Sequence, residues 1–223
     1  MSSTVGELLD SLPAAATQDE RRGWAVACAQ ALGLGGIAVA LGQQLVWFSD
    51  ETSARLEDLQ FVLGQGPSQR IQDETEVRQL PDLGRLLVQQ WPQFTAEAEG
   101  LGIAALFVWP VRIGAVQAGT MTGYRRTVGP LTEQQVAQGQ LVADTLAQHV
   151  LSHWPTTHVG NGSGHPGAVD LHRAEVHQAT GILSVRLGVS LSEALDRLRA
   201  RAYASGLSLS DTAHTIIQRE LPR

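Results

Sequence analysis

The sequence predicts an α+β domain followed by a small all-α domain, and three observations support this prediction. Short apolar runs bounded by glycine alternate with segments of helical spacing over the first two thirds of the chain. A stretch rich in Gly, Pro, Ser and Thr at 155–169 then shows no apolar periodicity. Beyond it, three amphipathic segments are separated by Gly188 and Gly206, which is typical of three short helices.

The composition is that of a folded protein without a membrane span. The 223 residues are 43% apolar and 17% charged, which excludes a wholly disordered chain. No apolar run reaches the ~18 residues needed to cross a bilayer, and residues 1–10 lack the regions of a signal peptide, so we expect a cytoplasmic protein. The single Cys28 excludes an internal disulfide, and its apolar neighbours favour a buried thiol over a reactive one.

Charge is distributed unevenly along the chain. All 16 basic residues are arginine, and the formal net charge is -6. From Asp170 onward, seven arginines are balanced by six acidic residues, whereas the preceding residues hold nine arginines and sixteen acidic residues. An acidic body and a nearly neutral, arginine-bearing tail indicate that any contact with nucleic acid belongs to the tail.

The clearest domain boundary is the segment 155–169. A stretch of this composition cannot bury enough apolar surface to offset the entropy of ordering it, so we expect a flexible linker. The linker divides a body at residues 5–154 from a tail at residues 170–223.

In the body, the pattern predicts a mostly antiparallel sheet with helices segregated to its sides. The runs IAVAL and LVWFS flank Gly42 and predict a hairpin, and a second hairpin joins 104–111 to 116–124. Leu80 precedes a proline, so residues 77–83 are expected to be extended. Helical spacing is found at 17–32, 52–63 and 86–99.

The longest helical candidate spans 131–154, and Thr132 with Gln135 fits a capping box at its start. One stripe comprises Val136, Gly139, Ala143, Leu146 and Val150, and a second comprises Leu141, Val142, Thr145 and His149. If the first stripe covers the sheet, the second is left for a partner helix, which predicts a homodimer held mainly by this segment. The alternative is a helix packed wholly on its own domain.

The tail predicts three helices around one small core. The first spans 171–187, the second begins at a capping box of Ser190 and Glu193, and the third is capped by Ser208. The apolar positions are Leu171, Ala174, Ala179, Ile182 and Leu183, then Leu191, Ala194, Leu195, Leu198 and Ala202, then Leu209, Ala213, Ile216, Ile217 and Leu221. A core this small is marginal without a partner surface.

The tail carries five short motifs, QATGIL, LGVS, EA, LR and LSDTA, which begin at 178, 187, 193, 198 and 209. In these motifs it resembles, over Val176 to Leu221, the ANTAR domain of bacterial transcription antiterminators. Thr180 stands where many members carry Lys, and Ser184 where they often carry Met, so a phosphate contact from position 180 is expected to be weakened. In that family a dimer engages a pair of small RNA hairpins, which implies RNA and a second copy as partners.

The body carries the motifs GQGP, LPDL, VWPVR and GPLT, which begin at 64, 80, 108 and 129. In these motifs it resembles a GAF domain of the kind joined to ANTAR tails in actinobacteria. GAF is a sensor fold, and some members bind cyclic nucleotides, tetrapyrroles or haem. The resemblance thus implies a GAF-like antiparallel sheet flanked by helices and an unspecified small ligand, because a fold by itself does not supply the ligand.

No catalytic constellation is present, so we expect a protein that is not an enzyme and holds no cofactor. The sequence lacks GxxxxGK[ST], HExxH and GxSxG. His149 and His153 would share a helix face, but no carboxylate or Cys completes a metal site there. Trp47, Trp109 and Arg112 are weak candidates for lining a ligand pocket, although aromatic residues on strands are usually part of the core.

The candidate RNA contacts are the polar residues that remain once the three apolar stripes of the tail face inward. They are Gln178, Arg186, Arg197, Arg201, Tyr203, Ser210 and His214. Guanidinium groups bind phosphate bidentately and stack on unpaired bases, and Tyr203 can stack on a base or simply pack. The alternative for Arg197 is a solvated i,i+4 pair with Glu193.

Two functions from different classes follow. The first is a signal-responsive, RNA-binding antitermination regulator. The second is a small-ligand sensor whose tail only dimerises or binds protein. A steep dependence of hairpin-RNA binding on salt would favour the first, because counterion release accompanies true phosphate contacts.

Overall fold

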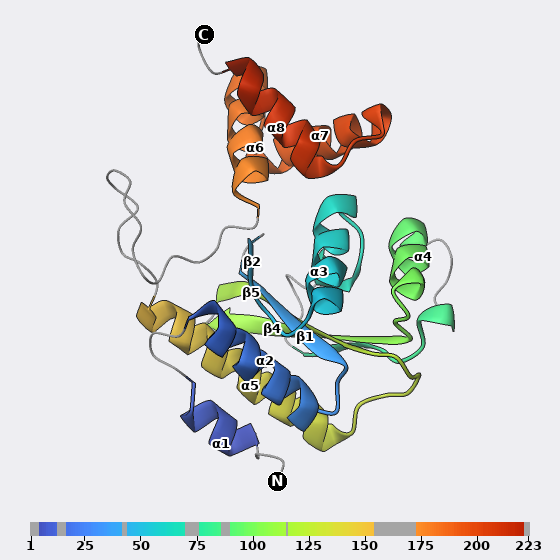
Figure 1. Ribbon diagram of the computed structural model, residues 1–223, viewed down its shortest axis with the longest axis vertical. Helices are drawn as coiled ribbons and strands as arrows, with labels where there is room; N and C mark the ends of the chain where they lie inside the picture. The colour runs from blue at the N-terminus through green and yellow to red at the C-terminus, as the bar shows by residue number, and fades with distance from the viewer. Residues whose placement is uncertain are drawn as a thin grey trace. The chain divides into compact units, whose positions relative to one another are not determined.

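The computed structural model describes residues 5–12, 17–41, 44–69, 76–85, 90–114, 116–153 and 173–220. The chain divides into two compact units, and the second contains Leu171–Arg223 (Figure 1). The predicted linker at 155–169 lies outside the described residues. The first unit is the body and the second is the tail.

The body is built on an antiparallel sheet whose described strands follow the order β2-β1-β5-β4-β3. The strands are β1 (Gly36–Leu41), β2 (Gln44–Phe48), β3 (Arg78–Leu80), β4 (Ala105–Ile113) and β5 (Val116–Arg125). Both predicted hairpins are confirmed as β1–β2 and β4–β5. The two hairpins join in the centre of the sheet, where Val39 pairs with Met121.

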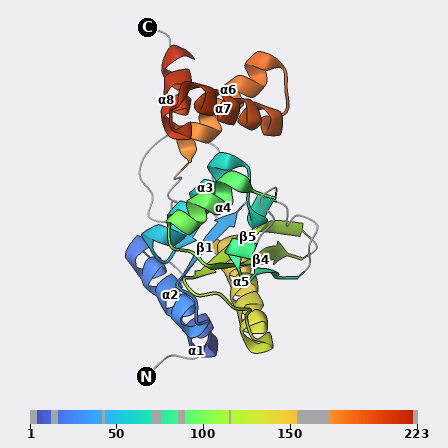
Figure 2. The ribbon, with the colours of Figure 1, turned by 90° about the vertical axis from the view of Figure 1, so that its right-hand side faces the viewer.

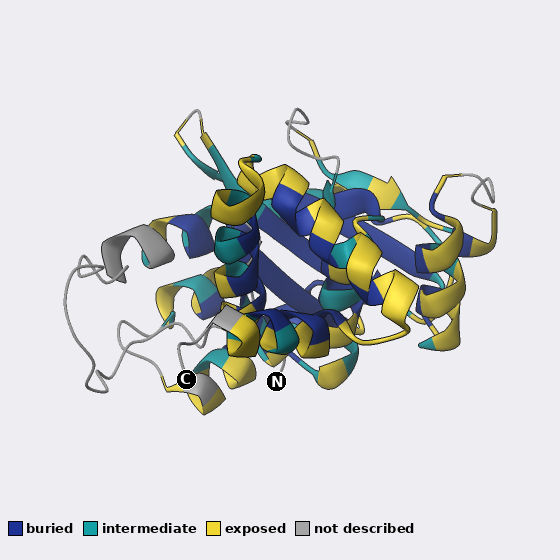
Figure 3. Ribbon diagram, turned by 90° about the horizontal axis from the view of Figure 1, so that it is seen from above, coloured by how far each residue is buried: buried dark blue, intermediate teal, exposed yellow. Residues whose placement is uncertain are grey.

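Helices cover both faces of this sheet. The helices α2 (Gln18–Ala31) and α5 (Glu133–His153) lie on one face, and α3 (Glu51–Leu63) and α4 (Pro92–Gly100) lie on the other (Figures 1 and 2). The strands form the buried middle layer, and each helix turns an exposed side outward (Figure 3). This arrangement confirms the predicted α+β class.

The sequence pattern missed the short helix α1 (Val5–Asp10), which packs on α2 and α5. Val5 and Leu8 are buried in the same core as Trp24. The indole N–H of Trp24 donates a 2.7 Å hydrogen bond to the Leu8 carbonyl. A helix of six residues is not stable alone, so this contact and the buried side chains hold α1 in place.

Two predicted segments differ in extent from the elements that form. The predicted helix at 86–99 is α4, which begins only at Pro92, because a residue that precedes proline is driven out of the helical region. Trp91 accordingly has φ -159°, and residues 86–89 are outside the described ranges. The predicted extended stretch at 77–83 contributes only the three residues of β3 and then enters the 3₁₀ turn η2 (Leu83–Arg85).

The two predicted stripes of α5 have different outcomes. Gly139, Ala143 and Leu146 are buried against the sheet, as expected for the first stripe. The second stripe is not continuous on the surface, because Val142 is buried and only Leu141, with 51% of its area exposed, is an exposed large hydrophobic residue. The reason is geometric: residues 141 and 142 lie ~100° apart on a helix, and Val142 falls on the buried side together with Ala143.

The tail comprises α6 (Ala174–Leu187), α7 (Leu191–Ser205) and α8 (Leu209–Glu220). Its core contains Val176, Ala179, Leu183, Ala194, Leu195, Leu198, Ala202, Leu209, Ala213 and Ile216. Gly188 and Gly206 end the first two helices in left-handed conformations with φ of 64° and 65°.

Some predicted core positions of the tail are wrong. Ala174 is exposed and its place is taken by the buried Val176, while Leu191 is 63% exposed. Leu191 is the first residue of α7, directly after the N-cap Ser190. Ile182 and Ile217 are half-buried, and Leu171 and Leu221 lie beyond the described residues.

The close packing of α5 on the sheet can be tested by adding one methyl group at Gly139. A Cβ on Gly139 would meet the Trp109 indole at 2.6 Å or less, whereas a Cβ on Gly23, in α2, would meet nothing within 4 Å. We expect Gly139→Ala to destabilise the body by about 1–3 kcal/mol. Gly23→Ala should stabilise it by up to about 1 kcal/mol, because alanine favours helix. Urea unfolding followed by tryptophan fluorescence measures both, and equal effects of the two variants would contradict the packing described.

Candidate nucleic-acid interface

All seven residues predicted to contact RNA are exposed in the tail. Gln178 and Arg186 lie on α6, Arg197, Arg201 and Tyr203 on α7, and Ser210 and His214 on α8. Their exposure follows from the buried stripes, since each helix has only one face in the core. The structure thereby makes them accessible, while their role in binding stays a prediction.

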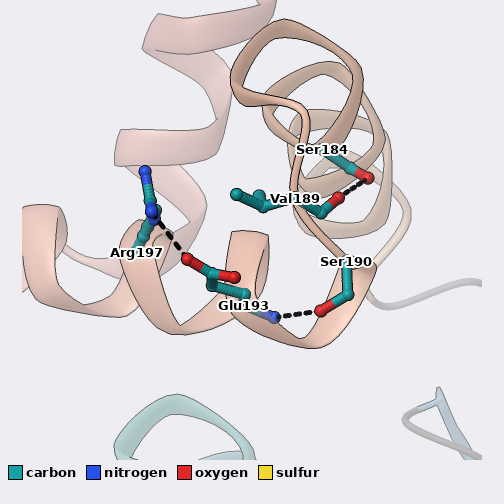
Figure 4. A network of polar contacts seen from close by, with 5 residues as sticks. All are labelled: Ser184, Val189, Ser190, Glu193 and Arg197. Atoms are coloured by element: carbon teal, nitrogen blue, oxygen red, sulfur yellow. Dashed lines mark hydrogen bonds and ion pairs between the residues drawn. The ribbon is translucent and has the colours of Figure 1, made fainter.

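The turn between α6 and α7 is held by a network of side-chain contacts (Figure 4). The Ser184 hydroxyl donates a 2.7 Å hydrogen bond to the Val189 carbonyl. The Glu193 N–H donates to the Ser190 hydroxyl at 3.2 Å, which caps α7. The Glu193 carboxylate is in turn 2.6 Å from a guanidinium nitrogen of Arg197. Ser184, one of the two departures from the ANTAR pattern, therefore has a structural role in this turn.

The arginines of α7 differ in how they are engaged. Arg197 is paired with Glu193, and Arg199 is paired with Asp196 at 2.9 Å. Within the described parts of the chain, Arg201 is exposed and makes no ion pair. Arg201 is therefore the guanidinium on this helix that an incoming phosphate reaches without displacing a carboxylate.

Tyr203 and Arg201 point to different sides of α7. Residues two positions apart in sequence are separated by about 200° around the helix axis. The side chains of Arg201 and Tyr203 therefore cannot meet the same nucleotide. Tyr203 is 79% exposed, which is unusual for an aromatic side chain and leaves its ring free for stacking. The sequence grouped the two residues as one surface, whereas the structure separates them.

A contact between α6 and α8 involves another candidate residue. The Nδ1 atom of His214 lies 3.3 Å from a carboxylate oxygen of Glu175. The acidic neighbour of His214 therefore competes with any phosphate for this imidazole.

A second histidine of the tail, His177, lies on α6. Burial and the charge of Arg173 lower its pKa, which keeps that imidazole neutral at neutral pH.

Thr180 does not occupy an RNA-facing position. It is only 6% exposed, and its hydroxyl donates a 2.7 Å hydrogen bond to the Val176 carbonyl. A lysine at this position could reach solvent only by running its aliphatic stem along the core. The Thr180 side chain points into the core of the tail, so its position gives no support to the expected loss of a phosphate contact.

The three weak ligand-binding candidates are not gathered around one opening. Trp47 and Trp109 are buried in the core beneath α2 and α5. Trp109 donates from its indole to the Val136 carbonyl at 3.1 Å, and Trp47 meets Trp24 edge-on with ring centroids 5.5 Å apart. Arg112 is half-exposed near the end of β4. Packing explains both tryptophans, and a ligand role for the three residues stays a prediction.

Sequence analysis missed a buried polar group on the opposite face of the sheet, beneath α3. Glu57 and Gln60 are 3% and 0% exposed, and the Glu57 carboxylate accepts hydrogen bonds from Gln60 at 3.0 Å and Thr122 at 3.2 Å. Gln60 also accepts from the N–H of Ser68, whose buried hydroxyl has no partner among the described residues. The signal was the spacing of Ser53, Glu57 and Gln60, which places polar side chains on the inner stripe of α3.

Within the described residues, no group of three or more His, Cys, Asp or Glu side chains could hold a metal ion. No described helix is long and apolar enough to cross a membrane.

Comparison with known proteins gives a family match for the tail and structural neighbours for the body. The model of the ANTAR domain matches residues 171–217. The body resembles a domain of a protein described as a two-component sensor histidine kinase from Sinorhizobium meliloti 1021, with TM-score 0.50, 16% identity, and coverage of 61% of this chain and 92% of that one. It also resembles the GAF domain of an Acinetobacter phosphoenolpyruvate-protein phosphotransferase, with TM-score 0.50, 8% identity, and coverage of 70% and 95%. No curated protein sequence matches the chain significantly.

These findings define a GAF fold in the body and an ANTAR domain in the tail. Residues 171–217 are an ANTAR domain, which implies an RNA-binding antitermination regulator. The body has the GAF fold. The chain therefore has the architecture of a GAF–ANTAR protein.

The one thiol of the chain is predicted to be inert in the native state. Cys28 is fully buried, and burial raises its pKa to about 12, so the nucleophilic thiolate is scarce at neutral pH. We expect a thiol reagent to leave the folded protein unmodified at pH 8 and to label one cysteine per chain in denaturant. Mass spectrometry measures both states, and rapid labelling without denaturant would contradict the described core.

Proposed function

We propose that this protein is a signal-responsive RNA-binding regulator of transcription antitermination in the cytoplasm. Its GAF body senses a signal, its dimeric ANTAR tail binds paired small RNA hairpins, and the chain catalyses no reaction. The ANTAR match at 171–217 carries the proposal. The exposed Arg197, Arg201 and Tyr203 on α7 support it, since they offer phosphate-binding and stacking groups on one helix.

Electrostatics supports a contact made by the tail alone. The tail has a formal excess of one arginine over its acidic residues, whereas the body is strongly acidic. Much of the tail's positive charge is paired, as in Arg197–Glu193 and Arg199–Asp196. A single tail therefore offers few uncommitted cations, and two tails joined in one dimer would gain affinity through effective concentration.

The outward surface of α5 supports a second copy as the partner of the body. Along this surface lie Gln134, Ala137, Leu141, Thr145 and Gln148, spaced by three or four residues and without a charge. In a two-fold interface each residue faces its own copy or a nearby one, so a charge-free stripe avoids repulsion between two acidic bodies. The stripe replaces the one predicted from the sequence, and it keeps Leu141 at its centre.

The polar group beneath α3 supports a polar small molecule as the signal. The Ser68 hydroxyl is buried and can donate one hydrogen bond that no described residue accepts. Buried polar atoms are nearly always satisfied, by protein, water or ligand. A solute with a hydrogen-bond acceptor would satisfy this atom.

One observation favours the alternative, a sensor whose tail binds protein. Val185 and Leu191 are 87% and 63% exposed near the turn between α6 and α7. Exposed aliphatic side chains of this size suit a protein surface better than an RNA backbone. Binding of hairpin RNA separates the two functions.

Replacement of Arg201 by Ala tests the RNA surface. If the Arg201 guanidinium binds a phosphate, Arg201→Ala should weaken binding of paired-hairpin RNA about tenfold. The slope of log K against log salt should also flatten by roughly 0.7–0.9, the value for one lost phosphate contact. Fluorescence anisotropy across a salt series measures both quantities.

The matched control removes a guanidinium from the body. Arg85 is highly exposed and pairs only with Asp82 among the described residues, so Arg85→Ala changes the net charge equally without touching the tail. We expect it to bind RNA like the parent. If both variants lose the same affinity, the effect reflects net charge, and the assignment of Arg201 fails.

Replacement of Leu141 by Glu tests the dimer. A carboxylate at the centre of the uncharged stripe would face its own copy across a two-fold axis, so Leu141→Glu should convert a micromolar dimer to monomer. The control is Val128→Glu, which places the same charge on an exposed apolar residue outside α5. Light scattering measures both variants, and a monomeric parent would contradict the dimer outright.

A further inference from the structure

Among the helices whose N-terminal cap residue the structure describes, three begin with the capping-box pattern, in which Ser or Thr is followed three residues later by Glu or Gln. In two of them the box is closed: the Thr17 N–H donates to Glu20 at 2.8 Å, and the Thr132 N–H donates to Gln135 at 3.0 Å. In the third, at the start of α7, only half of the box forms. The Ser190 hydroxyl accepts the Glu193 N–H, but within the described contacts the Glu193 carboxylate does not return to the Ser190 N–H.

The cause of this difference is the residue one turn further along each helix. Four residues after the Glu or Gln stand Trp24 in α2, Gly139 in α5 and Arg197 in α7. Only Arg197 is charged, and it draws the Glu193 carboxylate into a 2.6 Å charge-assisted bond. Glu193 therefore has two possible donors: the Arg197 guanidinium, which it binds, and the Ser190 backbone N–H, to which it does not bond.

We propose that Glu193 acts as an internal substitute for an RNA phosphate on Arg197 and is displaced when RNA binds. The inference rests on the proposed RNA-binding function. A phosphate offers the Arg197 guanidinium the same pair of anionic oxygens that a carboxylate does. Once released, the Glu193 carboxylate swings to the Ser190 N–H and closes the capping box, so that RNA binding is coupled to the stability of the first turn of α7.

The pair is suited to being displaced. The side chains of Arg197 and Glu193 are 50% and 51% exposed, so water already screens their attraction. An isolated exposed pair is weak, whereas a phosphate in an RNA hairpin brings neighbouring phosphates and releases counterions. Glu193 thus lowers the affinity for stray anions while allowing a polyanion to replace it.

Glu193→Gln separates the two roles of this residue. Glutamine cannot hold the Arg197 guanidinium through a charge, but it can close a capping box, as Gln135 does at the start of α5. We expect Glu193→Gln to tighten binding of paired-hairpin RNA roughly two- to fivefold. The amide hydrogen of Ser190 should exchange more slowly than in the free parent, and RNA should slow that exchange in the parent as well.

The control is Asp196→Asn in the same helix. It removes the same negative charge, but Asp196 is paired with Arg199 rather than Arg197. Each substitution is measured in the full-length protein, alone and combined with Arg197→Ala or Arg201→Ala. The proposal expects the gain from Glu193→Gln to vanish beside Arg197→Ala and to persist beside Arg201→Ala.

The outcomes distinguish this inference from the proposed function. A parent that binds no hairpin RNA overturns both. A parent that binds RNA overturns only the role of Glu193 if Asp196→Asn gives an equal gain, because the effect is then one of net charge. The same holds if the gain from Glu193→Gln survives the loss of Arg197, or if the exchange of the Ser190 amide is unchanged by RNA.

Discussion

The body depends on the close approach of α5 to the sheet, where Gly139 lies over the indole of Trp109. The indole is fully buried and donates to the Val136 carbonyl at 3.1 Å, so it both fills the space beneath α5 and fixes the rotation of the helix. A side chain on Gly139 would occupy the volume of the ring. Because rotation is fixed, the buried stripe and the uncharged outward stripe are determined together. The surface proposed for a second copy is therefore a consequence of packing at Trp109.

Much of the fold could be predicted from the sequence, and the exceptions have identifiable causes. The hairpins β1–β2 and β4–β5 were predictable because apolar runs end at glycines. α1 escaped because six residues show too little periodicity, and its position depends on a tertiary contact with Trp24. The start of α4 was misplaced because apolar spacing continues upstream of Pro92, whereas the proline excludes the preceding residue from the helix. Local sequence patterns therefore located most helices and strands. Contacts between residues distant in sequence determined those that the patterns missed.

The sequence predicted which residues of the candidate site are exposed, but it did not predict which of them form ion pairs. Subtraction of apolar stripes found seven exposed residues, because exposure on a small helical domain is the complement of its core. The sequence was compatible with two partners for Glu193: Ser190 in a capping box and Arg197 in an i,i+4 pair. Spacing alone cannot choose between them, since both fit helical geometry. The structure decides in favour of Arg197 at 2.6 Å because the guanidinium is charged and the Ser190 amide is not.

If the tail binds RNA as proposed, the pairing of acids with arginines explains how a surface with little net charge can select it. Glu193, Asp196 and Glu175 each lie against a basic or titratable group on the surface of the tail. Arg197 and Arg199 attract isolated anions weakly, since a weak ligand of either must compete with a carboxylate already in place. A hairpin presents several phosphates at once, and two linked tails would present a second surface to a second hairpin. In the proposed dimer, selectivity would arise from the number of ion pairs exchanged together, and dimerisation of the body through α5 would be part of RNA recognition.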